Sequence, residues 1–326
     1  MKGIRRAIDM LGPFLGLFLV FVLFLIIAPP AFYSLYNLKT IITQTVIIGI
    51  GALGMTLVII SGGIDLSVGS VIALSTIVVA RILNLGPASP GAAATFAAAL
   101  GGILIGALAG LCSGGISSGL RIVPFIVTLG MMQIARGTAK WLGNEQTVLA
   151  PRTWLNSLMD VDPEPGWLVL APGVWTLLIL TAVLTVVLNR TVFGRYVFAL
   201  GSNESAARLC GVRIARTRTI IYALAGAFTG MAGVMQFANL TVGDPTAARG
   251  MELDIIAAVV IGGGSLNGGE GSALGSVIGA LMMALLRNGC NLVGIPNYVQ
   301  NILIGAIIIG AVAADRYKTR RRQAVN

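Results

Sequence analysis

An acidic side chain inside an apolar run is the first feature of this sequence that could do chemistry. Asp65 lies in the stretch ISGGIDLSVGS, residues 60–70, together with Gly62, Gly63 and Gly69. A charge at the middle of a bilayer costs at least about 2.5–3.5 kcal/mol, so such a residue faces protein or water and marks a functional position. Two interpretations remain open. Asp65 is either the N-cap of the helix that follows, with a role in gate geometry, or a direct contact for a polar solute.

The remaining candidates for chemistry are few. Asp254, with Glu252 beside it in MELDIIAAVV, is the second acid at the edge of an apolar segment, and neither segment supplies a partner base. Proton coupling therefore has little support. The chain has no histidine, which excludes a histidine-ligated metal and a histidine-based catalytic triad. Its cysteines, Cys112, Cys210 and Cys290, lie far apart. We expect no catalytic residue and no metal site.

The composition of the chain indicates that these acids lie in a membrane protein. Hydrophobic residues make up 56% of the chain and charged residues 10%, with a mean hydropathy of +0.91. That is too little charge to cover a soluble domain of this size. Several apolar runs are long enough to cross a hydrocarbon core about 30 Å thick, and only helices satisfy the backbone of a single segment in lipid. The sequence predicts an all-α polytopic membrane protein, with the first apolar run retained as a helix.

Gly, Pro and charged residues divide the apolar runs into about ten candidate membrane spans, of which the eighth is short. They lie near residues 11–29, 41–60, 65–84, 93–119, 122–141, 167–188, 218–240, 254–264, 273–288 and 298–314. With this count, most of the 22 basic residues fall on the side that holds both termini. The positive-inside rule then predicts that both termini are cytoplasmic.

Two pairs of segments predict an internal repeat. TLVIISGG (56–63) aligns with AAVVIGGG (257–264), and GSVIALSTIVVAR (69–81) aligns with GSVIGALMMALLR (275–287). The copies are parallel under this span count, or one segment is re-entrant. In each copy glycines interrupt an apolar run, which is typical of broken helices along a transport route, although glycine also permits close helix packing. The predicted gate or pathway residues are Gly62, Gly63, Asp65, Ser67, Gly69, Gly263 and Gly264.

Two loops carry further signals. In the inside loop, about 189–217, Asn203 is placed to cap a short helix that ends at Gly211, with Ala206, Ala207 and Leu209 as its apolar face. This helix lies on the membrane or docks in a groove of a soluble partner. The outside loop, about 142–166, has all four tryptophans in or beside it, as an interfacial belt or a docking surface. No phosphate-binding P-loop motif is present, so another chain would have to bind any ATP.

Five ordered motifs resemble one family closely. They are GMTLVIISGGIDLSVGS, VPFIVTLGMMQIARG, GRYVFALGSNESAARLCGV, MELDIIAAVVIGGGSLNGGEGS and NGCNLVGIPNYVQ, and they cover residues from about 45 to 315. The chain is similar to the permease subunits of bacterial ABC importers of the ribose, xylose and galactose type. It departs from that pattern just before ELD, where Ala248, Arg249, Gly250 and Met251 replace the usual Gly-x-Gly-Tyr.

The resemblance implies a single permease domain over residues 1–326, in the bacterial inner membrane and without enzymatic activity. Its implied partners are an ABC ATPase, a periplasmic sugar-binding protein and a second permease, either another copy or a homologue. No cofactor would bind this chain, because ATP and Mg²⁺ would bind the ATPase. The resemblance implies that the inside loop couples to the ATPase, through Gly194, Arg195, Gly201, Asn203, Ala206, Ala207 and Gly211. It also favours a structural or gating role for Asp65.

The leading hypothesis is therefore import of a monosaccharide, held weakly by hydroxyl and amide groups. Candidate contacts are Thr128, Gln133, Asn239, Asn288, Asn291 and Gln300, each of which could instead bond helix to helix. A related alternative is a permease for a nucleoside, an autoinducer-like solute or an amino acid. A different alternative is an ion-coupled secondary transporter, which would need no ATPase.

Overall fold

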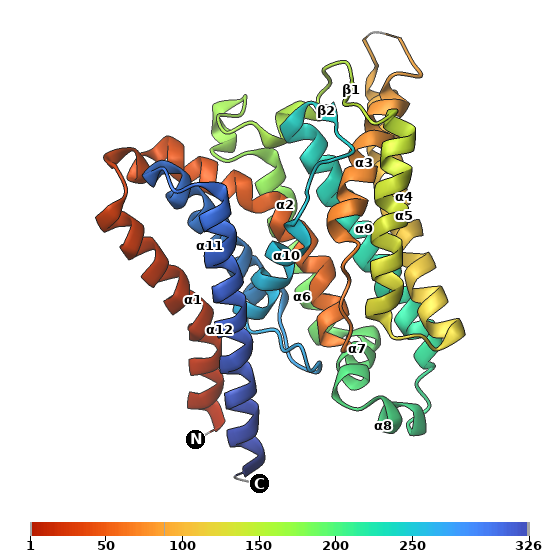
Figure 1. The fold of residues 1–326 in the computed structure, drawn as a ribbon, viewed down its shortest axis with the longest axis vertical. Helices are drawn as coiled ribbons and strands as arrows, with labels where there is room; N and C mark the ends of the chain where they lie inside the picture. Colours follow the sequence, from red (N-terminus) through yellow and green to blue (C-terminus); the bar gives the residue numbers. More distant parts are fainter. Residues whose placement is uncertain (1, 88, 325–326) are drawn as a thin grey trace.

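The computed structural model describes residues 2–87 and 89–324, with side chains over 12–87, 89–310 and residue 313. The described chain is mostly helical (Figure 1). Its α-helices are α1 (Lys2–Ile27), α2 (Leu35–Ile60), α3 (Val68–Leu83), α4 (Ala92–Leu120), α5 (Pro124–Gly143), α6 (Pro172–Arg190), α7 (Val192–Ser202), α8 (Glu204–Leu209), α9 (Ile214–Leu240), α10 (Met251–Ile261), α11 (Ala273–Val293) and α12 (Asn297–Ala324). Short 3₁₀ helices span Pro30–Tyr33, Asn156–Met159 and Gly166–Leu168.

The two ends of the bundle differ. Both chain termini and the helices α7 and α8 lie at one end, which we call the terminal end (Figure 1). The opposite end carries strands β1 (Val148–Leu149) and β2 (Val242–Gly243), which pair antiparallel. The predicted outside loop 142–166 is therefore folded against the segment that follows α9.

Helix α2 forms the centre of the bundle. Within its most apolar window, 89% of the residues are buried, because α6, α9, α10 and α11 pack around it. On the other side of α9, small residues let α4 approach closely. A Cβ atom on Gly230 would lie 2.6 Å from the carbonyl oxygen of Gly102, and one on Gly226 would overlap Gly106. Such backbone-to-backbone packing through glycine is typical of helices in membranes.

The lengths of the helices correct the predicted spans. Five helical segments are long and apolar enough to cross a membrane, and shorter apolar stretches occur in α1, α3 and α12. The five are Leu35–Ile60, Ala92–Leu120, Gly166–Arg190, Ile214–Leu240 and Ala273–Val293. The predicted span 254–264 is wrong. Helix α10 has 11 residues, which rise only about 16 Å, and residues 262–264 form a turn instead of continuing it.

The predicted inside loop 189–217 is largely helical. Helix α7 was not expected. It begins where the Thr191 hydroxyl accepts a hydrogen bond from the amide of Gly194 (3.1 Å), and a side chain at Gly194 would overlap the carbonyl of Leu188 at the end of α6. The predicted short helix is confirmed as α8: the Asn203 side chain accepts from the amide of Ala206 (2.9 Å).

The predicted apolar face of this short helix is wrong. Ala207 is buried against the bundle, whereas Ala206 is exposed and Leu209 is 90% exposed. Ala206 and Leu209 lie three residues apart on one side of the helix, and Ala207 lies about a quarter turn away. Helix α8 therefore packs on the bundle through Ala207 and presents Ala206 and Leu209 to the surroundings.

Candidate functional site

The two glycine-rich interruptions end their helices in the same way. In each, two consecutive glycine amides bond back to carbonyls of the last helical turn, and the first glycine has a positive φ, +81° at Gly62 and +93° at Gly263. This is the Schellman arrangement, which glycine adopts without a steric penalty. The bonds are Gly62 N to Ile59 O (2.9 Å), Gly63 N to Val58 O (3.0 Å), Gly263 N to Val260 O (3.0 Å) and Gly264 N to Val259 O (2.8 Å). The resemblance between the two segments thus extends to their backbone hydrogen bonds.

Asp65 organises the link between α2 and α3, but it is not an N-cap. Helix α3 begins at Val68, and Ser67 occupies the cap position. The carboxylate of Asp65 is buried, and its Oδ1 accepts from the amide (2.8 Å) and the hydroxyl (2.6 Å) of Ser67. A side chain that bonds to the backbone two residues ahead forms a local turn. Asp65 and Ser67 therefore hold each other in place. The predicted capping role of Asp65 is wrong, because its side chain forms a turn just before the helix.

Thr128 attaches α5 to this same link. Its side chain is fully buried and its hydroxyl accepts from the amide of Leu66 (3.3 Å). The hydroxyl also lies within hydrogen-bond distance of the carbonyls of Ile64 (3.2 Å) and Phe125 (3.1 Å), so it donates to one of them. Backbone groups outside helices need such partners when they are buried. Thr128, a predicted substrate contact, is bonded to the chain between α2 and α3.

Three segments that are remote in sequence meet through glycines at the terminal end. The amide of Gly269 donates to the carbonyl of Ile60 at the end of α2 (2.8 Å). A Cβ atom on Gly201, in the last turn of α7, would overlap that same carbonyl oxygen and lie 2.6 Å from the Gly269 nitrogen. A Cβ on Gly268 would lie 3.0 Å from the Cα of Gly62. We call Ile60, Gly62, Gly201, Gly268 and Gly269 the glycine junction.

The glycine junction brings together predicted residues from two different groups. Gly62 was predicted to lie at a gate, and Gly201 in the inside loop; the backbones of both pack against the segment that follows α10. Gly268 and Gly269 were missed, although the cluster LNGGEGS was a signal that could have identified them. The junction connects α7 to the ends of both interrupted segments.

Other predicted gate residues lie elsewhere. A side chain at Gly69, in the first turn of α3, would overlap Glu252 and the carbonyl of Ala248 at the start of α10. Close by in the chain, Asp254 forms an ion pair with Arg287, which the sequence did not reveal. Its Oδ2 accepts from Arg287 Nη2 (2.6 Å) and Nε (3.0 Å), and its side chain is 5% exposed. The pair joins α10 to α11, and each charge compensates the other.

The six predicted substrate contacts divide into two groups. Asn288 exchanges two 3.0 Å hydrogen bonds with Asn37, and Gln300 donates to Asn291 (2.8 Å), so these amides join α11 to α2 and to α12. Together with Thr128, they bond one segment of the chain to another. Gln133 on α5 and Asn239 on α9 are exposed, and their side-chain amides form no hydrogen bond with a described residue.

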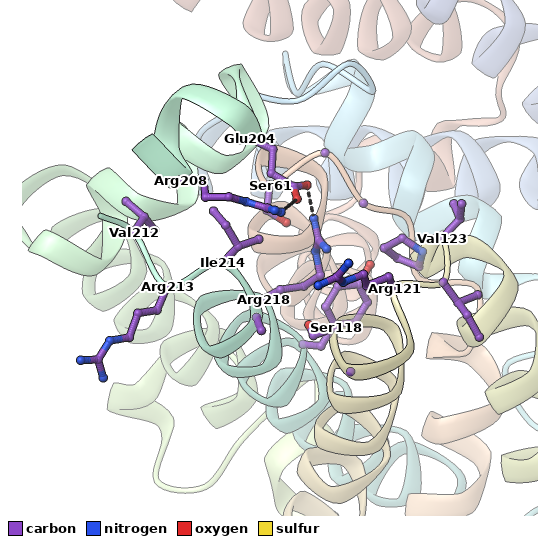
Figure 2. A pocket seen from close by; sticks show the side chains of 17 residues that line it. Ser61, Ser118, Arg121, Val123, Glu204, Arg208, Val212, Arg213, Ile214 and Arg218 are labelled. Atoms are coloured by element: carbon purple, nitrogen blue, oxygen red, sulfur yellow. Dashed lines mark hydrogen bonds and ion pairs between the residues drawn. The ribbon is translucent and has the colours of Figure 1, made fainter. Parts of the chain in front are cut away.

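A cavity of about 750 Å³ opens at the terminal end, beside the glycine junction. Its walls come from the turn after α2, the α4–α5 connection, α8 and the start of α9 (Figure 2). We call it the terminal cavity. Glu204 of α8 bonds across it to Arg218 of α9 (2.6 Å), so the cavity wall links α8 to the bundle.

The sequence matches a known family of transport proteins over most of the chain. The family described as the branched-chain amino acid transport system / permease component matches residues 37–312. This chain belongs to that permease family. The matched residues include both glycine turns, the glycine junction and the terminal cavity, so all three lie within the family's shared region.

Relatives with assigned names cover nearly the whole permease. The ribose import permease protein RbsC of Escherichia coli (strain K12) is 40% identical over 295 residues, which cover 89% of this chain and 88% of the relative. RbsC of Bacillus subtilis (strain 168) is 38% identical over 95% of this chain and 93% of its own length. The fructose import permease protein FrcC of Rhizobium meliloti is 34% identical, with 94% and 84% covered. No solved structure matches the permease.

Proposed function

We propose that this permease carries a monosaccharide across the inner membrane in an ATP-driven importer that a periplasmic binding protein supplies. The observation that carries the proposal is the likeness, along almost the full chain, to relatives named for the import of ribose and fructose. ATP and Mg²⁺ bind a partner ATPase, because the chain has no P-loop motif. The chain is a transport subunit and not the enzyme.

An amino acid is the second candidate substrate, because the family description names branched-chain amino acids. A zwitterion needs partners for both of its charges. The buried carboxylate of Asp254 and the partly exposed guanidinium of Arg287 bond to each other at 2.6 Å, so neither charge is free for a substrate. A neutral sugar needs only hydroxyl and amide partners, such as the exposed amides of Gln133 and Asn239.

The terminal end is the cytoplasmic end in this proposal. It holds both termini together with α7 and α8 (Figure 1), and the described basic residues Arg195, Arg208, Arg213 and Arg218 lie on or beside these two helices. The positive-inside rule places such residues in the cytoplasm. The terminal basic residues on which the prediction also depended lie outside the described side chains: Lys2, Arg5, Arg6, Arg316, Lys318, Arg320, Arg321 and Arg322.

Helix α8 is the proposed contact for the ATPase. It is held to the bundle through Ala207 and the Glu204–Arg218 ion pair, while Ala206 and Leu209 are left exposed. A short helix with an exposed apolar side chain fits a groove of a soluble partner. Movement of α8 would pass through α7 to the glycine junction, and from there to the ends of α2 and of the segment after α10.

We also propose that the two glycine-interrupted segments are parallel copies of one repeat and form the moving part of the pathway. The matching turns at Gly62–Gly63 and Gly263–Gly264 support this, as does the meeting of both segments at the same end. The exposed amide of Gln133 lies in the middle of α5 and is costly in lipid, so it would face the pathway or a second permease. Asn239, near the end of α9, lines a surface cavity with residues of the outside loop.

The test is to reconstitute the permease with its co-purified partners in liposomes and to follow uptake of labelled ribose and fructose after delivery by the binding protein. The proposal expects uptake that needs ATP on the ATPase side and persists when a protonophore collapses the proton gradient. Uptake without ATP that is lost with the gradient would instead establish an ion-coupled transporter. ATP-dependent uptake of leucine with no uptake of either sugar would favour the amino-acid candidate.

A further inference from the structure

The terminal cavity has a positively charged wall. Arg121, Arg208 and Arg218 line it together with one carboxylate, Glu204, which leaves the lining a formal charge of +2. The buried carboxylate of Asp65 is outside the lining but close enough for its charge to act on Tyr222. Arg213 also belongs to the lining, but its side chain is directed away from the others (Figure 2). Because like charges repel at close range, such a wall is unfavourable unless an anion or water compensates it.

The ion pairs within the cavity do not use all of this charge. Glu204 Oε1 bonds to Arg208 Nη2 (3.2 Å), and Oε2 bonds to Arg218 Nη2 (2.6 Å), so one carboxylate is shared between two guanidinium groups. Arg121 forms no ion pair with any described side chain. Each guanidinium has five N–H donors in a planar fork, and most of those at the cavity have no acceptor from the described protein.

Two hydroxyl groups on the same lining are also without partners. Tyr222 is only 1% exposed, and its hydroxyl makes no hydrogen bond with the described residues. The Ser118 hydroxyl is likewise buried and unpaired. A buried hydroxyl without a partner costs about 1–3 kcal/mol, so few are retained in native proteins without a role. Both residues line the terminal cavity.

We propose that the terminal cavity binds a phosphoryl group. A tetrahedral oxyanion accepts hydrogen bonds at several oxygens at once, and guanidinium forks bind it in two-pronged pairs. Arg121 and Arg218 supply the charge. The Tyr222 and Ser118 hydroxyls have almost no exposed surface in this structure, so they would donate to the bound group after a small shift of the lining. A neutral sugar would gain nothing from the net charge of the wall.

Two sources of phosphate are present at this site when the terminal end is cytoplasmic, as proposed above. A headgroup of an anionic phospholipid and a free phosphate ion offer the same oxyanion to the cavity. The bound group would bridge Arg218 of α9 and Arg121 after α4, on the wall that also holds Glu204 of α8. Occupancy would thereby stabilise the position of α8. The proposal concerns a second ligand and does not depend on which solute is transported.

The test uses the purified full chain in maltoside micelles, which contain no phosphate, and measures its thermal unfolding midpoint. Inorganic phosphate is titrated against sodium chloride of equal ionic strength, and phosphatidylglycerol is added in a separate series. A ligand that binds the native state raises the midpoint. A rise with inorganic phosphate identifies a free-ion site, whereas a rise with phosphatidylglycerol alone identifies a lipid headgroup site.

Variants decide whether the rise comes from this cavity. Arg121→Gln, which breaks no ion pair, should weaken binding roughly ten- to a hundredfold, as expected for one lost charge-assisted contact. Tyr222→Phe should weaken it less and should fold, since no hydrogen bond is lost. Arg213→Gln is the matched control and should bind as the unmodified chain does. An equal rise in the Arg121→Gln and Arg213→Gln chains, or no rise with either ligand, would overturn the proposal.

Discussion

Replacing Gly201 with alanine should disable the glycine junction. The added methyl group would overlap the carbonyl oxygen of Ile60 and lie 2.6 Å from the nitrogen of Gly269. Those two atoms form the 2.8 Å hydrogen bond that joins the end of α2 to the segment after α10, so the methyl group must push them apart. Overpacking of this kind costs about 1–3 kcal/mol. Loss of the hydrogen bond adds about 1–3 kcal/mol if its groups stay buried and unpaired.

The combined cost is at least about 2 kcal/mol, which changes an equilibrium roughly thirtyfold. We expect a lower thermal unfolding midpoint and at least a tenfold loss of sugar uptake in the reconstituted complex. The partner's basal ATP hydrolysis should persist, because the substitution does not touch it. The assay is therefore the ratio of uptake to ATP hydrolysis, measured together with the unfolding midpoint.

Gly115→Ala is the matched control for this substitution. Gly115 lies near the terminal end of α4, and a Cβ atom there would meet no atom within 4 Å. Alanine favours the helix by roughly 1 kcal/mol over glycine, so the control should be neutral or slightly more stable. Equal midpoints and equal uptake ratios for Gly201→Ala and Gly115→Ala would show that the junction tolerates a side chain at Gly201 and is not needed for transport.

Substitutions at three further positions test single contacts by thermal unfolding. Asp65→Ala leaves two donors of Ser67 without their acceptor and should cost about 1–3 kcal/mol, whereas Asp65→Asn keeps an acceptor oxygen and should cost less. Equal loss of uptake in both variants, with unchanged stability, would instead indicate a role for the charge. Thr128→Val should lower the midpoint, since the Leu66 amide loses its partner; an unchanged midpoint would contradict this. Asn288→Leu should cost about 0.6–1.7 kcal/mol, and a stabilised chain would show that its pairing with Asn37 contributes nothing.

Local patterns predicted the local features of the fold. The all-α membrane architecture followed from composition, and α8 followed from Asn203 as a cap and Gly211 as a stop. Both glycine interruptions are real, because a Schellman turn needs glycine where φ is positive and the sequence shows that glycine directly.

Contacts between remote segments could not be predicted in this way. The bonds of Asn288 to Asn37 and of Arg287 to Asp254 depend on how helices pack, which no short pattern specifies. Gly201 looked like part of a surface loop, yet its missing side chain is needed for contact with Ile60. The prediction that Asp65 is an N-cap was wrong for a smaller reason. An aspartate just before a helix can cap the helix or form a turn with the residue two places ahead, and the two positions differ by only two residues.

Helix α8 is the proposed contact for a partner ATPase, and transport should depend on that contact. The most direct measurement is to purify the tagged chain from its native membrane in mild detergent and to quantify the co-purifying ATPase. We expect stoichiometric ATPase with the unmodified chain and a loss of ATPase with Leu209→Asp on α8. Leu149→Asp is the control, because Leu149 is an exposed leucine at the opposite end, and it should retain the ATPase. Retention of the ATPase by Leu209→Asp would show that α8 does not form this contact, and transport by a chain that carries no ATPase would exclude an ATP-driven importer.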